Sequence, residues 1–276
     1  MPEHLREGTL PKMKIAMAQV LSTANPMHNL AIIRDYAKQA AAQDAKLVVF
    51  PEAMQISFGH SLTKIAEPLG GPWATLVKQL ARDIGINIVA GMFTPGTAGH
   101  VRNTLLVTGP DADTHYDKIH LYDAFGFSES DTVTPGERPV QFVIDEVTFG
   151  LATCYDIRFP QLFTHHARQG ALVNLVSASW GAGARKAEQW TTLAQARALD
   201  STTFVLAVDQ ADPLSMGHEP KGSAPLGVGH SIAVGPLGEV LAEAGSAPEL
   251  LVVDLDLTEV VTAREQLPVL DNAIDF

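Results

Sequence analysis

The chain has 276 residues, of which 46% are hydrophobic and 18% are charged, and its formal net charge is −12. This composition is typical of a globular protein, and the negative charge opposes binding to nucleic acid or to an anionic membrane. No apolar run approaches the roughly 18 residues of a membrane-spanning helix, and residues 1–12 lack the hydrophobic core of a signal peptide. A single cysteine rules out an internal disulfide. We therefore expect a soluble cytoplasmic protein.

The first half of the chain is expected to mix strands with two helices. Apolar runs between turn residues predict strands, and stretches with helical spacing predict helices. The expected strands are 12–20, 46–52, 86–93, 102–110 and 114–121. The expected helices are 29–43, after a break at Asn25 and Pro26, and 73–85, closed by Gly85. Residues 122–139 are polar and rich in turn residues, which predicts a surface loop.

The second half continues with strands, two more helices and a long loop. The expected strands are two within 140–154, then 171–179, 201–210, a hairpin over 229–245 and 249–257. The expected helices are 159–170 and 184–200, and the expected loop is 211–228. Neither a change of composition nor a repeat marks a domain boundary. We expect one layered α/β domain over residues 1–276, with two sheets face to face and helices outside.

Cys154 lies between the apolar strand that precedes it and the helix expected from residue 159. A thiol near a helix N-terminus feels a positive potential, which lowers its pKa from about 8.5 toward neutrality. The next backbone N–H, on Tyr155, is placed to stabilise an oxyanion. Cys154 is therefore a candidate nucleophile. The alternative is a small buried side chain that only packs, as most free cysteines do.

A thiol nucleophile usually takes histidine as its base. The chain has ten histidines, and none forms a recognisable pair with Cys154. We expect His165 and His166 to be partly exposed on their helix, and no partner can be named for His120 or His230. A base other than histidine is therefore considered.

Glu52 and Lys118 are the other candidate bases. Glu52 ends an apolar strand, where apolar surroundings raise the pKa of a carboxyl group and improve it as a proton acceptor. Lys118 lies in the run 114–121, which is expected to be half buried, and a buried ammonium needs partners. The simpler alternatives are a solvated loop carboxylate and a lysine on the exposed face of its strand.

Several motifs follow one another in a recognisable order. They are FPE with Glu52, DKIHL with Lys118, GFSESDTVTPGE with Glu129, CYDIRFP with Cys154, and the hairpin GHSIAVGPLGEVLAEAG. Together these stretches resemble the nitrilase superfamily of carbon–nitrogen hydrolases over about residues 12–264. The resemblance therefore covers nearly the whole chain.

This resemblance implies a four-layer α-β-β-α sandwich and a homodimer formed through the outer helices. It also implies roles in the hydrolysis of a small-molecule amide or nitrile. Glu52 would take the proton of Cys154, whose thiolate would attack the substrate. Lys118 and the N–H of Tyr155 would hold the oxyanion, and Glu129 would orient Lys118 or the substrate. Neither a metal nor a cofactor is expected, because the sequence shows no metal-ligand spacing and no nucleotide-binding glycine motif.

CYDIRFP and GHS most resemble the Nit1/Nit2-like amidase branch, the ω-amidases and deaminated-glutathione amidases, which act on amides of small carboxylic acids. An anionic substrate in a protein of charge −12 needs local positive charge. The candidates are Arg158, Arg185 and Lys186, although Arg158 is equally well explained by an ion pair with Asp156. Trp180 is expected to line the pocket.

Two departures from the branch leave the substrate open. Gln161 stands where many members have glutamate, and the segment 179–190 differs from the ω-amidase pattern. The alternatives within the same chemistry are a nitrilase and an N-carbamoyl amide hydrolase. Outside it stand a silent binding or scaffold protein and a redox sensor, which would lack a resolving cysteine.

Overall fold

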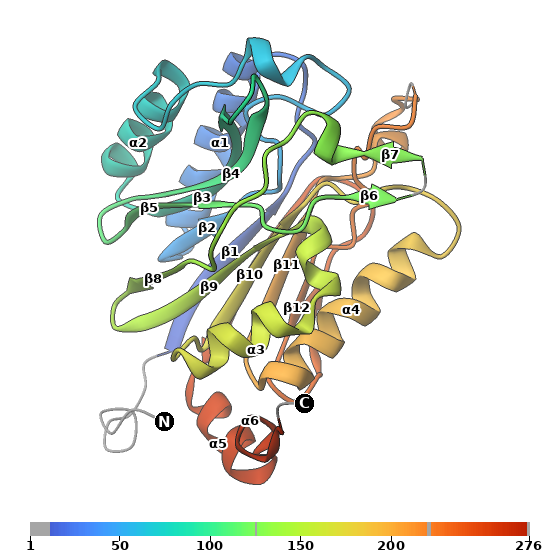
Figure 1. Ribbon diagram of the computed structural model, residues 1–276. Coiled ribbons are helices and arrows are strands. Elements are labelled where there is room, and N and C mark those ends of the chain that lie inside the picture. The colour runs from blue at the N-terminus through green and yellow to red at the C-terminus, as the bar shows by residue number, and fades with distance from the viewer. Residues whose placement is uncertain (1–11, 125, 220–221, 275–276) are drawn as a thin grey trace.

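The computed structural model describes residues 12–124, 126–219 and 222–274, and it shows two six-stranded sheets packed face to face (Figure 1). The first sheet has the order β14-β1-β2-β3-β4-β5. Its strands are β1 (Lys12–Gln19), β2 (Leu47–Val49), β3 (Asn87–Pro95), β4 (Val101–Thr108), β5 (Asp113–Asp117) and β14 (Glu249–Asp256). β2 runs parallel to β1 and β3, and the other pairs are antiparallel.

The second sheet has the order β13-β12-β11-β10-β9-β8. Its strands are β8 (Gln141–Ile144), β9 (Val147–Thr153), β10 (Val173–Ala178), β11 (Phe204–Asp209), β12 (Ile232–Val234) and β13 (Val240–Glu243). β10 runs parallel to β9 and to β11. Each sheet therefore has three adjacent parallel strands, which are β1, β2 and β3 in the first sheet and β9, β10 and β11 in the second.

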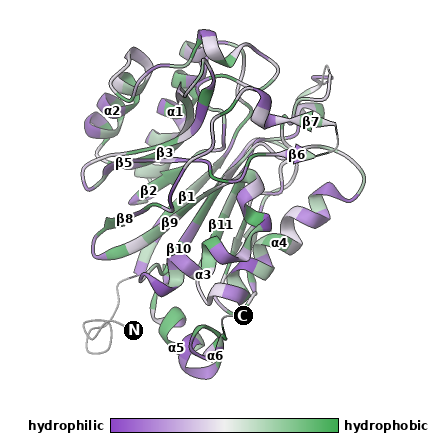
Figure 2. Ribbon diagram, viewed as in Figure 1, coloured by the Kyte–Doolittle hydropathy of each residue, from purple (hydrophilic) through white to green (hydrophobic). Residues whose placement is uncertain are grey.

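Helices cover the outer face of each sheet and complete four layers. α1 (Pro26–Ala41) and α2 (Pro72–Ile84) pack on the first sheet, and α3 (Pro160–Arg168) and α4 (Lys186–Ser201) pack on the second. The largest apolar cluster lies between the sheets and includes Met17, Phe149 and Leu206. The helices carry both hydrophobic and hydrophilic residues, as expected of helices with one buried face (Figure 2). The predicted α/β sandwich is confirmed.

Local differences from the predicted elements have clear physical causes. α1 begins at Pro26, three residues before the predicted start, because the Asn25 side chain accepts hydrogen bonds from the N–H groups of Met27 and His28 and caps the helix. After β14 the chain forms α5 (Thr258–Gln266) and α6 (Val269–Asn272), where no helix was predicted.

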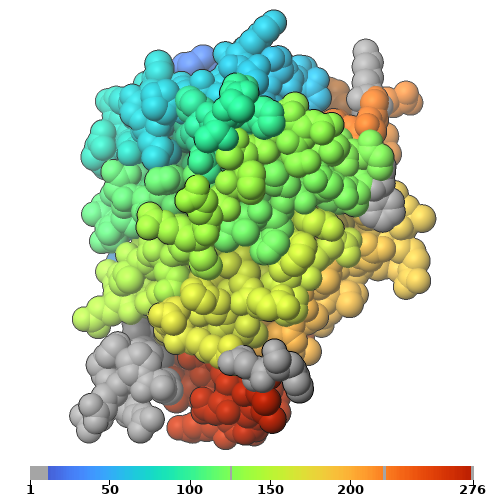
Figure 3. All heavy atoms as spheres, in the orientation of Figure 1, coloured from blue at the N-terminus to red at the C-terminus, as the bar shows by residue number. Residues whose placement is uncertain are grey.

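The predicted surface loop 122–139 is only partly a surface loop. It contains the short strands β6 (Asp123–Ala124) and β7 (Phe127–Ser128) and a single 3-10 turn, Glu129–Asp131. Segments from the middle of the chain fill the surface between the N-terminal helices and the helices of the second sheet (Figure 3). Glu129 points inward and is 3% exposed, so this segment contributes to the interior.

The two sheets bring the ends of several strands to one edge of the molecule. Because the carboxyl ends of parallel strands meet at the same edge of a sheet, the residues after β2, β9 and β10 lie near one another. Ser177 of β10 donates a hydrogen bond of 2.7 Å from its hydroxyl to the carbonyl of Phe50, which follows β2. This bond fastens the two sheets together beside the site. Within the described residues, every helix is too short or too polar to cross a lipid bilayer.

Candidate active site

Glu52 lies three residues after the end of β2 and is held from both sheets. Its Oε1 accepts hydrogen bonds from Asn103 Nδ2 at 2.6 Å and from Lys118 Nζ at 3.2 Å. Its Oε2 accepts a bond of 2.9 Å from the N–H of Ser179, which follows β10 in the second sheet. A side chain at Gly91 of β3 would collide with the backbone of Glu52, so glycine is required there. Glu52 is 1% exposed and has one well-defined position.

Lys118 follows β5 and is also buried, at 2% exposed. Its ammonium contacts two carboxylates, Glu52 Oε1 at 3.2 Å and Glu129 Oε2 at 2.8 Å. Asn103 of β4 bridges the same two carboxylates, since its Nδ2 also donates to Glu129 Oε1 at 3.1 Å. Glu129 accepts a further bond of 2.7 Å from the N–H of Tyr122. Lys118 is thus more deeply buried than the half-buried run that the sequence predicted, and two carboxylates contact its ammonium.

The charges in this cluster follow from burial and from the neighbouring ions. Burial raises the pKa of Glu52, Lys118 opposes that shift, and the Glu129 carboxylate adds to it. Burial lowers the pKa of Lys118, but Glu129 and Glu52 outweigh it and hold that pKa well above its usual value. The neighbouring carboxylates therefore favour the charged form of Lys118, and burial increases the affinity of Glu52 for a proton, which is the direction expected from the sequence.

Cys154 begins the 3-10 turn Cys154–Arg158 directly after β9. Its φ of 47° lies in the left-handed region, which is unusual for a residue other than glycine and is typical of strained functional positions. Its thiol lies 3.8 Å from the carbonyl of Ser179 and is 8% exposed. Burial raises the pKa of the thiol well above its usual value and Glu52 raises it further, although Lys118 lowers it. The predicted lowering was wrong, because burial dominates and the following turn is short.

A buried hydrogen-bond network ties the Cys154 turn to the segment that carries Lys118. Asp156 Oδ2 accepts from the hydroxyl of Tyr116 at 2.7 Å, and Asp156 Oδ1 accepts from the N–H of His120 at 3.0 Å. Asp156 Oδ1 also lies 2.7 Å from Nδ1 of His120. The suggested ion pair between Arg158 and Asp156 is therefore wrong, and His120, for which no partner could be named, has one.

The neighbouring histidine pair also differs from expectation. His166 is fully buried rather than partly exposed, and its Nε2 lies 3.1 Å from the carbonyl of Leu151. Burial lowers the pKa of His166 to about 4, so it is neutral at physiological pH. Only His165 is exposed, as predicted.

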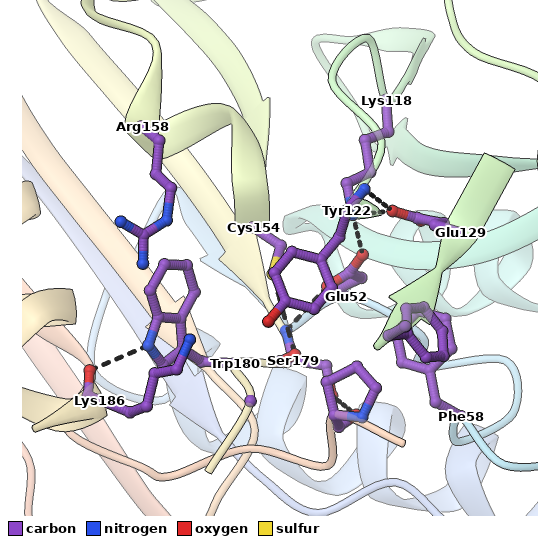
Figure 4. Close-up of a pocket in the computed structure, with 13 residues that line it drawn as sticks. Glu52, Phe58, Lys118, Tyr122, Glu129, Cys154, Arg158, Ser179, Trp180 and Lys186 are labelled. Carbon is purple, nitrogen blue, oxygen red and sulfur yellow. Dashed lines mark hydrogen bonds and ion pairs between the residues drawn. The ribbon is translucent and has the colours of Figure 1, made fainter. Parts of the chain in front are cut away.

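These groups open into a pocket (Figure 4). Glu52, Lys118, Glu129 and Cys154 are all buried and are among its lining residues. The remaining lining residues are Phe58, Tyr122, Phe127, Arg158, Ser179, Trp180, Gly181, Lys186 and Pro225. The pocket thus combines one buried charged cluster with largely aromatic walls.

Two cations of the pocket lining, Arg158 and Lys186, lie beside the ring of Trp180. The guanidinium of Arg158 lies 5.1 Å from the ring centre of Trp180 and donates 2.8 Å to Oε1 of Gln189. Lys186 Nζ lies 5.8 Å from the same ring and 5.9 Å from that of Tyr122. Burial lowers the pKa of Lys186, and the charge of Arg158 lowers it further.

Two other sequence candidates, Arg185 and Tyr155, lie elsewhere. The side chain of Arg185 is 81% exposed, pairs with Glu188 at 2.8 Å and is not among the lining residues. The ring of Tyr155 packs edge-on against Tyr122 outside the lining, while its N–H lies in the first turn after Cys154, where helical N–H groups lack a partner within the turn. Trp190 is fully buried beneath Trp180.

The sequence analysis missed Asn103 and Ser179. Asn103 sits in β4 between strands on both sides, and Ser179 acts through its backbone. A signal for Asn103 was present, because an amide side chain lies within a predicted strand, two residues before the apolar run 105–107. Among the described residues, no group of three histidine, cysteine, aspartate or glutamate side chains is arranged to hold a metal ion.

Comparisons with known proteins agree with this geometry. The family model for carbon-nitrogen hydrolases matches residues 14–265. A Mycobacterium tuberculosis protein named only as a hydrolase is 52% identical over 96% of both chains. The deaminated glutathione amidase of Escherichia coli O157:H7 is 31% identical over 94% of this chain and 97% of that protein.

A solved structure gives the same result. It is a mutant of the amidase from Nesterenkonia sp. AN1, described as carrying acrylamide added at its active-site cysteine. It is 26% identical, covers 93% of this chain and 98% of its own, and superposes with a TM-score of 0.74. The protein therefore belongs to the carbon–nitrogen hydrolase family, the nitrilase superfamily, and within it to the Nit1/Nit2-like amidase branch.

Proposed function

We propose that the protein is an amidase that uses Cys154 as nucleophile, Glu52 as general base and Lys118 as oxyanion ligand. The observation that carries this proposal is the buried contact of Lys118 with both Glu52 and Glu129. Cys154, the single cysteine, lines the same pocket as these three residues. Burying the ionisable side chains of Glu52, Lys118 and Glu129 is unfavourable for the free energy of folding, and a scaffold protein would have no use for them. The homodimer and the cytoplasmic location remain predictions.

In the first half of the reaction, Glu52 accepts the proton of the Cys154 thiol as the sulfur attacks the amide carbon. The carbonyl oxygen becomes an oxyanion, which the Lys118 ammonium and the Tyr155 N–H stabilise. When the C–N bond breaks, Glu52 returns the proton to the leaving nitrogen, and ammonia departs. A thioester on Cys154 remains. Burial and the Glu52 carboxylate raise the pKa of the thiol, so the sulfur needs a base to take its proton, and Glu52 is placed to do so.

In the second half, a water molecule replaces ammonia. Glu52 removes its proton, the hydroxyl oxygen attacks the thioester carbon, and Lys118 again holds the oxyanion. The C–S bond breaks, the sulfur takes the proton from Glu52, and the carboxylic acid leaves. Glu129 lies 2.8 Å from the Lys118 ammonium and orients it toward the oxyanion in both halves.

The finer proposal is that the substrate amide carries a carboxylate at its other end, as in monoamides of small dicarboxylic acids. Arg158 and Lys186 lie together on the wall beside Trp180, and their mutual repulsion is relieved by a bound anion. The deaminated glutathione amidase relative is consistent with this class. The aromatic walls would contact the short carbon chain between the two ends.

The experiment that tests the proposal measures ammonia release with the wild type and with Cys154→Ala. The substrates are monoamides of dicarboxylic acids, deaminated glutathione, aliphatic amides, nitriles and N-carbamoyl amino acids. We expect turnover of an anionic amide that vanishes in the variant. Turnover that survives in Cys154→Ala would refute the thiol mechanism. Preference for a nitrile or an N-carbamoyl compound would refute the amidase assignment, and no turnover at all would favour a silent binding protein.

Arg158→Met is expected to lower kcat/KM for succinic acid monoamide about 10-fold to 100-fold, because a charge-assisted hydrogen bond contributes about 1.5–3 kcal/mol. Butyramide, which has no carboxylate, should lose less than about threefold on the same scale. The matched control is Arg185→Met, which removes an exposed arginine 27 positions along the chain and should change neither value. Equal losses for both substrates in Arg158→Met would show that Arg158 is structural.

A further inference from the structure

Asp209 is a fully buried carboxylate that the proposed mechanism does not use. It is the last residue of β11, and its side chain forms no ion pair with any described residue. Its partners are backbone N–H groups. Oδ1 accepts from Trp180 at 2.7 Å and Oδ2 accepts from Val228 at 2.9 Å, while the N–H of Gln210 also supports the carboxylate.

These N–H groups belong to two loops that contribute residues to the pocket lining. Trp180 is the second residue of the loop between β10 and α4, and Val228 lies in the loop between β11 and β12. Other bonds join the loops beside Asp209. The N–H of Gly227 donates to the carbonyl of Trp180 at 3.0 Å, and the Ser179 hydroxyl donates to the carbonyl of Pro225 at 2.8 Å. Asp209 is the buried group that bonds to both loops at once.

The position of Trp180 determines the shape of the pocket wall that it forms together with Arg158 and Lys186. Its ring lies close to Arg158 and Lys186, and its indole N–H donates to the Lys186 carbonyl at 2.9 Å, at the start of α4 (Figure 4). We infer that Asp209 is a positioning residue for substrate binding: by holding the N–H groups of Trp180 and Val228, it keeps the Trp180 wall in the conformation that accepts the substrate carboxylate. The identity of the substrate in this inference rests on the proposed function, whereas the hydrogen bonds of Asp209 are independent of it.

The inference makes substrate binding sensitive to pH. Burial raises the pKa of Asp209 to about 7, although the three backbone N–H groups oppose the shift. The ionisable groups that act on it across the site are Glu52, whose charge raises the pKa of Asp209, and Cys154, on which Asp209 acts in return. Above this pKa both carboxylate oxygens accept N–H bonds. Below it one oxygen carries a proton that faces an N–H donor, so the wall loosens as the pH falls through 7.

The first test measures KM and kcat of wild type and Asp209→Asn for an anionic amide between pH 6 and 8. An asparagine amide presents an NH₂ group where one N–H bond is now accepted, so it imitates the loosened state at every pH. We expect KM to rise about tenfold with kcat within about twofold, and the rise of wild-type KM at low pH to be absent in the variant. Asp212→Asn is the matched control and should behave as wild type, because Asp212 is half-buried in the same loop and caps a 3-10 turn, which asparagine also does. An unchanged KM, or an equal loss in kcat, would overturn the inference.

A second test needs no turnover and separates the inference from the proposed function. Tryptophan fluorescence is followed from pH 5.5 to 8.5 in wild type, in Trp180→Phe and in Asp209→Asn. We expect a transition near pH 7 in wild type that both variants lose. If the transition is present but no amide is hydrolysed, the proposed function fails and the role of Asp209 stands. If Asp209→Asn does not fold, the comparison of wild type with Trp180→Phe still decides, and a wild type without the transition overturns the inference.

Discussion

Replacing Lys118 with methionine is expected to abolish turnover and to lower the free energy of unfolding by about 3–5 kcal/mol, because it leaves buried carboxylates without their cation. Lys118 is the only cation in contact with Glu52 or Glu129 among the described residues, and all three side chains are nearly inaccessible. The loss is measured by urea unfolding at pH 7.5 and by ammonia release.

Two further variants separate stability from catalysis. In Lys118→Met combined with Glu129→Gln, one of the stranded charges is gone, so part of the stability should return while turnover stays absent. Lys46→Met is the matched control, since Lys46 forms an ion pair with Asp145 in which both side chains are about half exposed, and such a pair contributes about 1 kcal/mol or less. If Lys118→Met unfolds at the wild-type urea concentration, the buried cluster does not carry the charges argued for it.

Replacing Glu52 with glutamine should remove activity without removing stability. A missing general base costs about 10²–10⁴ in rate, and in the proposed mechanism Glu52 acts in both halves of the reaction. Glutamine keeps one oxygen for the bonds from Asn103 and Lys118, whereas its NH₂ group replaces the oxygen that accepts from the Ser179 N–H. The loss of that bond is offset because a buried charge beside Glu129 is removed, and Glu129 still pairs with Lys118. We therefore expect kcat to fall by at least about 10² while the urea midpoint stays close to that of the wild type. The value of kcat, from ammonia release, and the urea midpoint, from unfolding, are measured on the same preparation.

The reactivity of the Cys154 thiol provides a second, independent measurement on the Glu52→Gln variant. Because the Glu52 carboxylate raises the pKa of Cys154, its removal should shift the pH profile of iodoacetamide alkylation to lower pH. A more reactive thiol in an inactive enzyme is the signature of a lost base. Glu265→Gln, on the exposed face of α5, is the control and should change neither profile nor rate. A Glu52→Gln variant that keeps more than a tenth of wild-type kcat would exclude this residue as the base.

The sequence was most informative where a polar residue ends an apolar strand. Glu52 after β2 and Cys154 after β9 were found in this way, and the structure places both in one pocket. The same signal was present at Asp209 in the run VLAVDQ and was passed over, because an aspartate at a strand end is usually solvated. Fold class and element order followed from periodicity, since sheet and helix patterns are local properties of the chain.

What the sequence could not supply is the direction in which a side chain points after a turn. Arg185 and Lys186 are neighbours with the same charge, yet only Lys186 reaches the pocket. The difference arises because Arg185 has a φ of 58° and sends its side chain outward to Glu188. Likewise, Asp156 was paired with Arg158 by proximity along the chain, whereas tertiary packing brings it to Tyr116 and His120.

The hydrogen bond from the Ser179 N–H to Glu52 joins residues 127 positions apart, one from each sheet. Neither half of the molecule therefore holds a working set of groups, because Glu52 and Lys118 come from the first sheet and Cys154 comes from the second. Contacts between distant parts of a chain form late in folding. During refolding, turnover should consequently return only with the last phase, after the circular dichroism signal of both sheets has recovered, so that catalysis itself reports when the two sheets have docked.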